Sequence, residues 1–166
     1  MKYALLIAII APMMVLSANA SDKTQVLSEV NGMTTCTKVT SFDKRLSQDM
    51  PCSYKAVMGS SNIYAIRHID FQLPNGDKIK TTDNIRFAQK ANGDLVYKDS
   101  KITLNTAQAV IINISPKTFK EILSSRMDEL RAMDNPDYSK ILHCFKPIDS
   151  ETAFCVPYDF LLKANK

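Results

Sequence analysis

Two copies of the tripeptide Asn-Gly-Asp, at 75–77 and 92–94, constrain the fold more than any other feature of this sequence. Asn and Gly accept the positive φ angles of two-residue hairpin turns, so each copy predicts a tight turn between antiparallel strands. The flanking segments are rich in β-branched and aromatic residues. Residues 62–114 are therefore predicted to form an antiparallel meander. Its last run, 109–114, is apolar on both faces and should be a central strand.

The first strand of this meander has two different faces, because successive side chains of a strand point to opposite sides. One face is apolar except for an arginine and is expected to meet the core: Ile63, Ala65, Arg67, Ile69, Phe71 and Leu73. The other face becomes polar along the strand and places His68 and Asp70 side by side near solvent.

Residues 115–133 are predicted to form an amphipathic helix of about five turns that covers one face of the sheet. Ser115 is a suitable N-cap, and Pro116 is a suitable first helical residue. Apolar residues recur at intervals of three and four: Phe119, Ile122, Leu123, Met127, Leu130 and Met133. A second, shorter helix is predicted from Pro136 to Pro147, with an apolar stripe made of Tyr138, Ile141, Leu142 and Phe145.

Short strands are predicted on both sides of these elements. Residues 33–42 and 52–58 form an early hairpin around a polar loop at 43–51, and residues 152–156 form a last strand. The predicted fold class is α+β, an antiparallel β-meander sheet of about five to seven strands with the C-terminal helices packed on one face. No internal repeat or long linker divides residues 21–166, which should form a single domain.

Residues 1–20 have the pattern of a secretory signal peptide. Lys2 precedes an uncharged apolar run, 4–16, and Ala18-Asn19-Ala20 is a small-x-small cleavage site. An uncleaved membrane anchor is the alternative, but the run is shorter than the roughly 20 apolar residues of a membrane span. The mature protein is therefore expected to be periplasmic or secreted, with no stable membrane span after cleavage.

All four cysteines, Cys36, Cys52, Cys144 and Cys155, lie after the predicted cleavage site. An even number of cysteines in an exported chain favours disulfides. Of the three possible pairings we favour the local one, in which Cys36 pairs with Cys52 and Cys144 pairs with Cys155. The chain has neither a Cys-x-x-Cys nor a His-x-x-x-His pair, so we expect no metal site and no cofactor.

The two histidines, His68 and His143, are the first candidates for chemistry. His68 and Asp70 could form an imidazole–carboxylate pair of the kind used in general base catalysis. No serine or cysteine lies in a nucleophile-elbow sequence, so a surface histidine on a sheet is the alternative that we favour. His143, next to Cys144, is expected to cap the C-terminal end of the second helix.

The net charge of +4 is spread along the chain, with only small basic clusters such as Lys78 with Lys80, so nucleic acid is not an expected partner. We favour a non-enzymatic binding protein, such as an inhibitor or immunity-type protein that captures another exported or envelope protein. Its expected binding residues lie on the solvated strand face: Tyr64, His68, Asp70 and Arg86. The alternatives are a small secreted hydrolase that uses His68 and Asp70, or a structural or assembly factor of the envelope.

Overall fold

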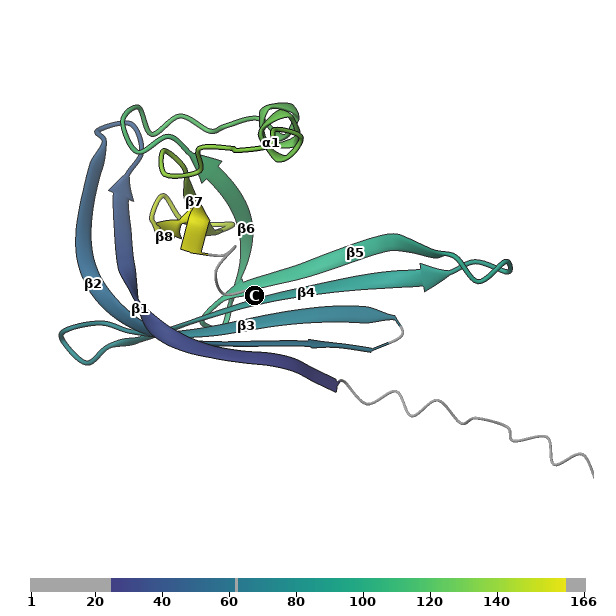
Figure 1. The fold of residues 1–166 in the computed structure, drawn as a ribbon. Coiled ribbons are helices and arrows are strands. Elements are labelled where there is room, and N and C mark those ends of the chain that lie inside the picture. Colours follow the sequence, from purple (N-terminus) through teal and green to yellow (C-terminus); the bar gives the residue numbers. More distant parts are fainter. Residues whose placement is uncertain (1–24, 62, 161–166) are drawn as a thin grey trace, which may run out of the picture.

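The computed structural model describes residues 25–61 and 63–160 and shows a closed, eight-stranded antiparallel β-barrel (Figure 1). The predicted signal peptide, residues 1–20, lies outside the described residues. Consecutive strands are neighbours in the barrel, and β8 returns to pair with β1. The strands are β1 (Gln25–Ser41), β2 (Leu46–Ser60), β3 (Tyr64–Gln72), β4 (Lys78–Gln89), β5 (Leu95–Leu104), β6 (Ala107–Ile114), β7 (Leu142–Pro147) and β8 (Ala153–Pro157). The predicted α+β class is therefore wrong.

The predicted turns of the meander are confirmed. Gly76 has a φ of 88° and Gly93 a φ of 90°, a region that glycine enters without a steric penalty. The Gly76 N–H donates to the carbonyl of Leu73, and the Gly93 N–H donates to the carbonyl of Lys90, both at 2.9 Å. Each Asn-Gly-Asp copy thus closes a hairpin, the first between β3 and β4 and the second between β4 and β5.

The predicted loop at 43–51 is much shorter in the structure. β1 runs to Ser41 and β2 already begins at Leu46, so only residues 42–45 make the turn. Arg45 takes a φ of 53° and donates its N–H to the carbonyl of Phe42 at 3.2 Å. The polar and charged residues that suggested a loop instead form the exposed start of β2, because pairing with β1 satisfies their backbone groups.

The predicted helix over 115–133 is also wrong in extent. In the described residues the only helix longer than a single turn is α1 (Ser124–Arg131). Before it, the Phe119 N–H donates to the Ser115 carbonyl, and Phe119 takes a φ of 57°, which ends any helical turn. The reason is that the apolar residues of the predicted stripe serve two separate cores. Phe119 packs beside Ile114, whereas Met127 packs with Ile141 and Tyr158.

The predicted second helix, from Pro136 to Pro147, is replaced by β7 over its last part. β7 pairs with β6 on one side and with β8 on the other. Over so short a segment the pattern of apolar and polar residues fits a helix as well as a strand. The segment forms a strand because it pairs with a neighbour on each side. The predicted last strand, 152–156, is confirmed as β8.

The barrel interior is packed with side chains. Phe71 lies at its centre, with ring centroids 5.1 Å from Phe154 and 5.9 Å from Phe160. The inner core consists of Cys36, Cys52, Ala56, Ile69, Phe71, Phe154, Val156 and Phe160. β8 is buried on both faces, because its alternate residues, Ala153 and Cys155, belong to an outer cluster with Val39, Ile114 and Cys144.

Both predicted disulfides are confirmed. Cys36–Cys52 joins β1 to β2 within the inner core, and Cys144–Cys155 joins directly opposed residues of β7 and β8 in the outer cluster. Two structural disulfides favour a protein that folds in an oxidising, extracytoplasmic compartment. No helix among the described residues has the length and apolar character needed to span a membrane.

Part of the sheet projects from the barrel as an arm (Figure 1). The arm consists of residues 25–28, 57–60, 64–67, 83–89 and 95–101 on strands β1 to β5. It projects because the strands at its two sides have a neighbour on one side only. β5 pairs with β6 only through its last three residues, and β1 pairs with β8 only through three residues near its C-terminal end.

Candidate functional site

The four predicted binding residues lie on one face of the sheet. Tyr64 is opposite Arg86, and the same β3–β4 register sets His68 opposite Thr82 and Asp70 opposite Lys80. This outward face is the reverse of the face that carries Ile69 and Phe71 into the inner core.

The four residues form two pairs and not one cluster. Tyr64 and Arg86 lie on the arm, whereas His68 and Asp70 lie nearer the barrel. Asp70 is six residues along the strand from Tyr64, or about 20 Å. Arg86 forms a bidentate ion pair with Asp99 across β4 and β5, with both N···O distances at 2.6 Å. The hydrogen bonds from Arg86 lower the pKa of Asp99 below its ordinary value. The Asp99 carboxylate is therefore ionised and compensates the charge of the Arg86 guanidinium group.

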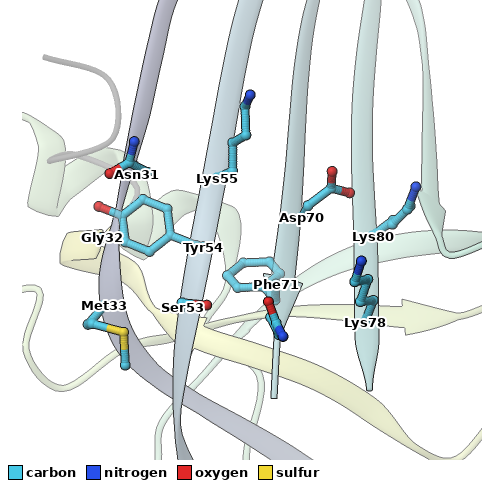
Figure 2. Close-up of a pocket in the computed structure, with 11 residues that line it drawn as sticks. Asn31, Gly32, Met33, Ser53, Tyr54, Lys55, Asp70, Phe71, Lys78 and Lys80 are labelled. Atoms are coloured by element: carbon cyan, nitrogen blue, oxygen red, sulfur yellow. The ribbon is translucent and has the colours of Figure 1, made fainter. Parts of the chain in front are cut away.

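A groove of about 590 Å³ lies on the outward face beside Asp70. Figure 2 shows one row of its side chains, Asn31, Lys55, Asp70 and Lys80, one from each of the neighbouring strands β1 to β4. Met33, Ser53, Gln72 and Lys78 line it on the same face, and Gly32, Tyr54 and Phe71, which alternate with them along the strands, complete the lining. The cross-strand register positions the row, so the spacing of these groups follows from strand pairing alone.

The groove has a surplus of positive charge at one end. Lys55 Nζ lies 2.8 Å from Glu29 Oε1, which compensates that ammonium group. Lys78 and Lys80, on β4, form no ion pair with any residue that the structure describes. Amide and hydroxyl groups of Asn31, Ser53 and Gln72 add hydrogen-bond donors and acceptors. This arrangement suits a ligand that carries carboxylate groups along an extended backbone.

His68 bridges Asp70 and a hydroxyl group that the sequence alone does not identify. Its Nε2 lies 3.1 Å from Asp70 Oδ1, and its Nδ1 lies 3.0 Å from Thr82 Oγ1. Carboxylate, imidazole and hydroxyl in a row is the order found in hydrolytic triads. Counting outward from the Asn75-Gly76 turn would have set Thr82 opposite His68, so hairpin register is the signal that could have found this residue.

The surroundings of this row are those of an open sheet. The His68 and Asp70 side chains are 36% and 41% exposed. The neighbouring backbone N–H groups belong to the β2–β3 and β3–β4 ladders, so they are already hydrogen-bonded. An oxyanion would have to be stabilised by side chains such as the Lys80 ammonium group.

His143 does not cap a helix, contrary to the prediction. It lies on β7, is 5% exposed, and its Nδ1 is 2.9 Å from Asn113 Oδ1. Its Nε2 has no hydrogen-bond partner among the described residues. Burial lowers the pKa of His143 to about 3, and the positive charge of Arg67 lowers it further. His143 is therefore neutral at ordinary pH, with the Nδ1 proton donated to Asn113.

Arg67, the one polar residue of the predicted apolar strand face, also lies on the inner side of the sheet. Its guanidinium group pairs with Asp83 of β4 at 3.1 Å, and both side chains are mostly buried. A charged residue at this position is tolerated because its partner stands directly opposite in the register.

Among the described residues, no group of three or more His, Cys, Asp or Glu side chains could hold a metal ion. Comparison of the chain with protein-family models, with curated proteins and with solved structures finds no match.

Proposed function

We propose that this protein is an exported binding protein, periplasmic or secreted, that captures another protein through the outward face of β1 to β4. The groove beside Asp70 is the observation that supports this proposal. It offers two ammonium groups, Lys78 and Lys80, that form no ion pair within the described part of the chain, next to neutral polar side chains and Asp70. The complementary ligand is an acidic segment of a partner, because carboxylates would pair with the lysines while backbone groups bond to the amides.

A rigid sheet is a suitable platform for such recognition. The groove residues come from four paired strands, and the Cys36–Cys52 disulfide joins two of these strands, β1 and β2. A preorganised surface loses little conformational entropy on binding, which favours affinity. An inhibitor or immunity-type protein is the finer form of the proposal, since these proteins act by rigid occlusion of a partner.

Affinity capture with the oxidised mature protein, residues 21–166, tests the proposal on envelope and secreted extracts. We expect one stoichiometric partner, identified by mass spectrometry. The double charge reversal Lys78→Glu with Lys80→Glu should reduce its recovery by about tenfold or more, because it replaces attraction by repulsion at the groove.

The matched control carries Lys117→Glu with Lys120→Glu, the same charge change on an exposed loop away from the groove. It should recover the partner as the wild type does. Equal recovery by both double variants would show that the groove is not the binding surface. Loss of recovery with both would assign the effect to net charge.

Hydrolysis is the second candidate function, and the Asp70–His68–Thr82 row is the observation that favours it. In this reaction Thr82 Oγ1 would attack a carbonyl while His68 takes its proton. A panel of esters and peptides is the suitable assay. Activity should be lost with Thr82→Val, which removes the hydroxyl at constant shape, and with His68→Ala. Activity that survives both substitutions would eliminate this site as its source.

A further inference from the structure

A second pocket, of about 420 Å³, lies on the outer surface of the barrel and shares no lining residue with the groove beside Asp70. Its floor is the outward face of β6, where Val110, Ile112 and Ile114 recur at every second position. Ile114 is 1% exposed and Val110 is 42% exposed, so the floor is covered at one end and open at the other. Pockets for small molecules have volumes of roughly 300–1,000 Å³, so the size suits such a ligand.

Two aromatic side chains form the covered end of this pocket. Phe42 comes from the turn between β1 and β2, Phe119 comes from the segment after β6, and both pack against the outer cluster that contains Ile114. The two segments lie side by side at one end of the barrel (Figure 1). The segment that carries Phe119 is held against β6, because the Ile122 N–H donates to the Asn113 carbonyl at 2.7 Å. The Phe119 ring is therefore a preformed wall of the pocket.

Three carboxylates and one ammonium group surround the apolar floor. Asp43, Glu121 and Glu151 come from three different connecting segments, and Lys146 of β7 stands opposite Val110. None of the three carboxylates forms an ion pair or a side-chain hydrogen bond with a residue that the structure describes. Three negative charges and one positive charge give the lining a net charge of −2. The pocket thus combines an apolar floor with an excess of negative charge.

This combination selects one class of ligand. An anion would be repelled by the carboxylates. A neutral apolar molecule would remove water from the carboxylates without replacing their hydrogen bonds, which costs free energy. A bare metal ion does not fit either, because no group of three acidic, histidine or cysteine side chains in the described part of the chain could hold one. A ligand that is both apolar and positively charged satisfies the floor and the rim together.

We propose that this pocket binds a small organic cation, a molecule that carries an ammonium group on an apolar body. The apolar body lies on the floor formed by β6, against the rings of Phe42 and Phe119. The ammonium group lies among Asp43, Glu121 and Glu151, and the aromatic rings attract it further. The inference is independent of the proposed function, because the pocket and the groove have separate linings of opposite charge.

Titration of the oxidised mature protein, residues 21–166, with 3-phenylpropylammonium tests the proposal, with backbone amide NMR shifts as the readout. For a probe of about ten non-hydrogen atoms we expect a dissociation constant of roughly 0.1–1 mM. The shifted amides should include those of Val110, Ile112 and Phe119. The matched neutral probe, 3-phenylpropanol, should bind about fivefold more weakly or worse, and the anion 3-phenylpropionate should not bind, because only the cation compensates the carboxylates.

The double variant Glu121→Gln with Glu151→Gln removes two carboxylates at nearly constant shape and should weaken binding of the cation about fivefold or more. The matched control, Glu29→Gln with Glu129→Gln, makes the same charge change at two glutamates outside the pocket, which are 51% and 60% exposed. It should bind the cation as the wild type does. All four glutamates are exposed, so both double variants should fold.

Four results would overturn the proposal. They are a cation that does not bind saturably, a cation that binds no better than the alcohol, a pocket variant that binds the cation as the wild type does, and equal weakening by both double variants. A captured protein that is lost with the pocket variant, when no probe binds, would assign the pocket to that protein and overturn the small cation as well.

Discussion

The chain has two histidines, and the fold gives them opposite environments. His68 lies partly exposed on the outward face between Asp70 and Thr82. His143 lies inside the barrel, between the ring edges of Phe145 and Tyr158. The residue type is the same, so the surroundings alone decide which imidazole is available for chemistry.

Protonation of His143 is expected to destabilise the protein in mild acid. The pKa of His143 is about 3 in the folded state, below the ordinary value of 6.5, so unfolding takes up a proton below pH 6.5. The free energy of unfolding should fall by about 2 kcal/mol between pH 7 and pH 5 from this residue. Urea unfolding at several pH values, with the disulfides intact, measures this slope.

His143→Gln should flatten the pH dependence between pH 7 and pH 5, because glutamine retains a donor for Asn113 but does not titrate. The other histidine supplies the control. His68→Gln makes the same substitution at the chain's other imidazole, which is 36% exposed. An unchanged slope in His143→Gln would show that another group causes the acid sensitivity.

At the level of elements, the segment from β6 to β7 shows how an apolar periodicity can mislead. Residues 115–133 have the three- and four-residue spacing of a helix stripe, yet only Ser124–Arg131 is helical. Within that stripe Met127 is 1% exposed, whereas Leu123 is 70% exposed and Met133 is 45% exposed. Periodicity indicates which residues could share a face, but it does not tell which of them find a partner.

The two methionines of this segment give a direct test. Met127→Ala should lower the free energy of unfolding by about 2–4 kcal/mol, because Met127 fills a buried site between Ile141 and Tyr158. Met133→Ala should change it by less than about 0.5 kcal/mol. A continuous helix with one buried stripe would give large losses for both, so equal effects in denaturant titrations would contradict the short α1.

At the level of the whole molecule, closure of the barrel depends on a short seam. β1 and β8 pair only through Thr37 with Cys155, Lys38 with Phe154, and Val39 with Ala153. Neither disulfide crosses this seam, because one joins β1 to β2 and the other joins β7 to β8. Burial of β8 on both faces, and not a covalent link, therefore holds the barrel closed.

Removal of either disulfide should weaken the barrel without opening it. The bonds close loops with sequence separations of 16 and 11. The double variants Cys36→Ala/Cys52→Ala and Cys144→Ala/Cys155→Ala should each lower the free energy of unfolding by about 3 kcal/mol, because the unfolded chain gains entropy without the cross-link. Circular dichroism should retain the β spectrum, while the urea midpoint falls. Loss of the folded spectrum in either variant, in the absence of urea, would show that a disulfide is required for closure.

The features of the fold that could be predicted from the residues are local ones. The Asn-Gly-Asp copies specify turns because positive φ is a property of the residues themselves. The disulfide pairing follows from cysteines that are close in sequence. The two-residue alternation of 64–72 correctly separated the inner side chains from the outward ones, which include Tyr64, His68 and Asp70.

The remaining features depend on pairing between segments that are distant in the sequence, so no local pattern predicts them. The choice of strand over helix at Leu142–Pro147 results from two neighbouring strands, β6 and β8, that no local pattern reveals. Closure needs β8 to meet β1 from the other end of the chain, and that pairing turns the predicted meander sheet into a closed barrel. The groove, the Thr82 contact of His68 and the burial of His143 all follow from these long-range registers, since each brings together groups from different strands.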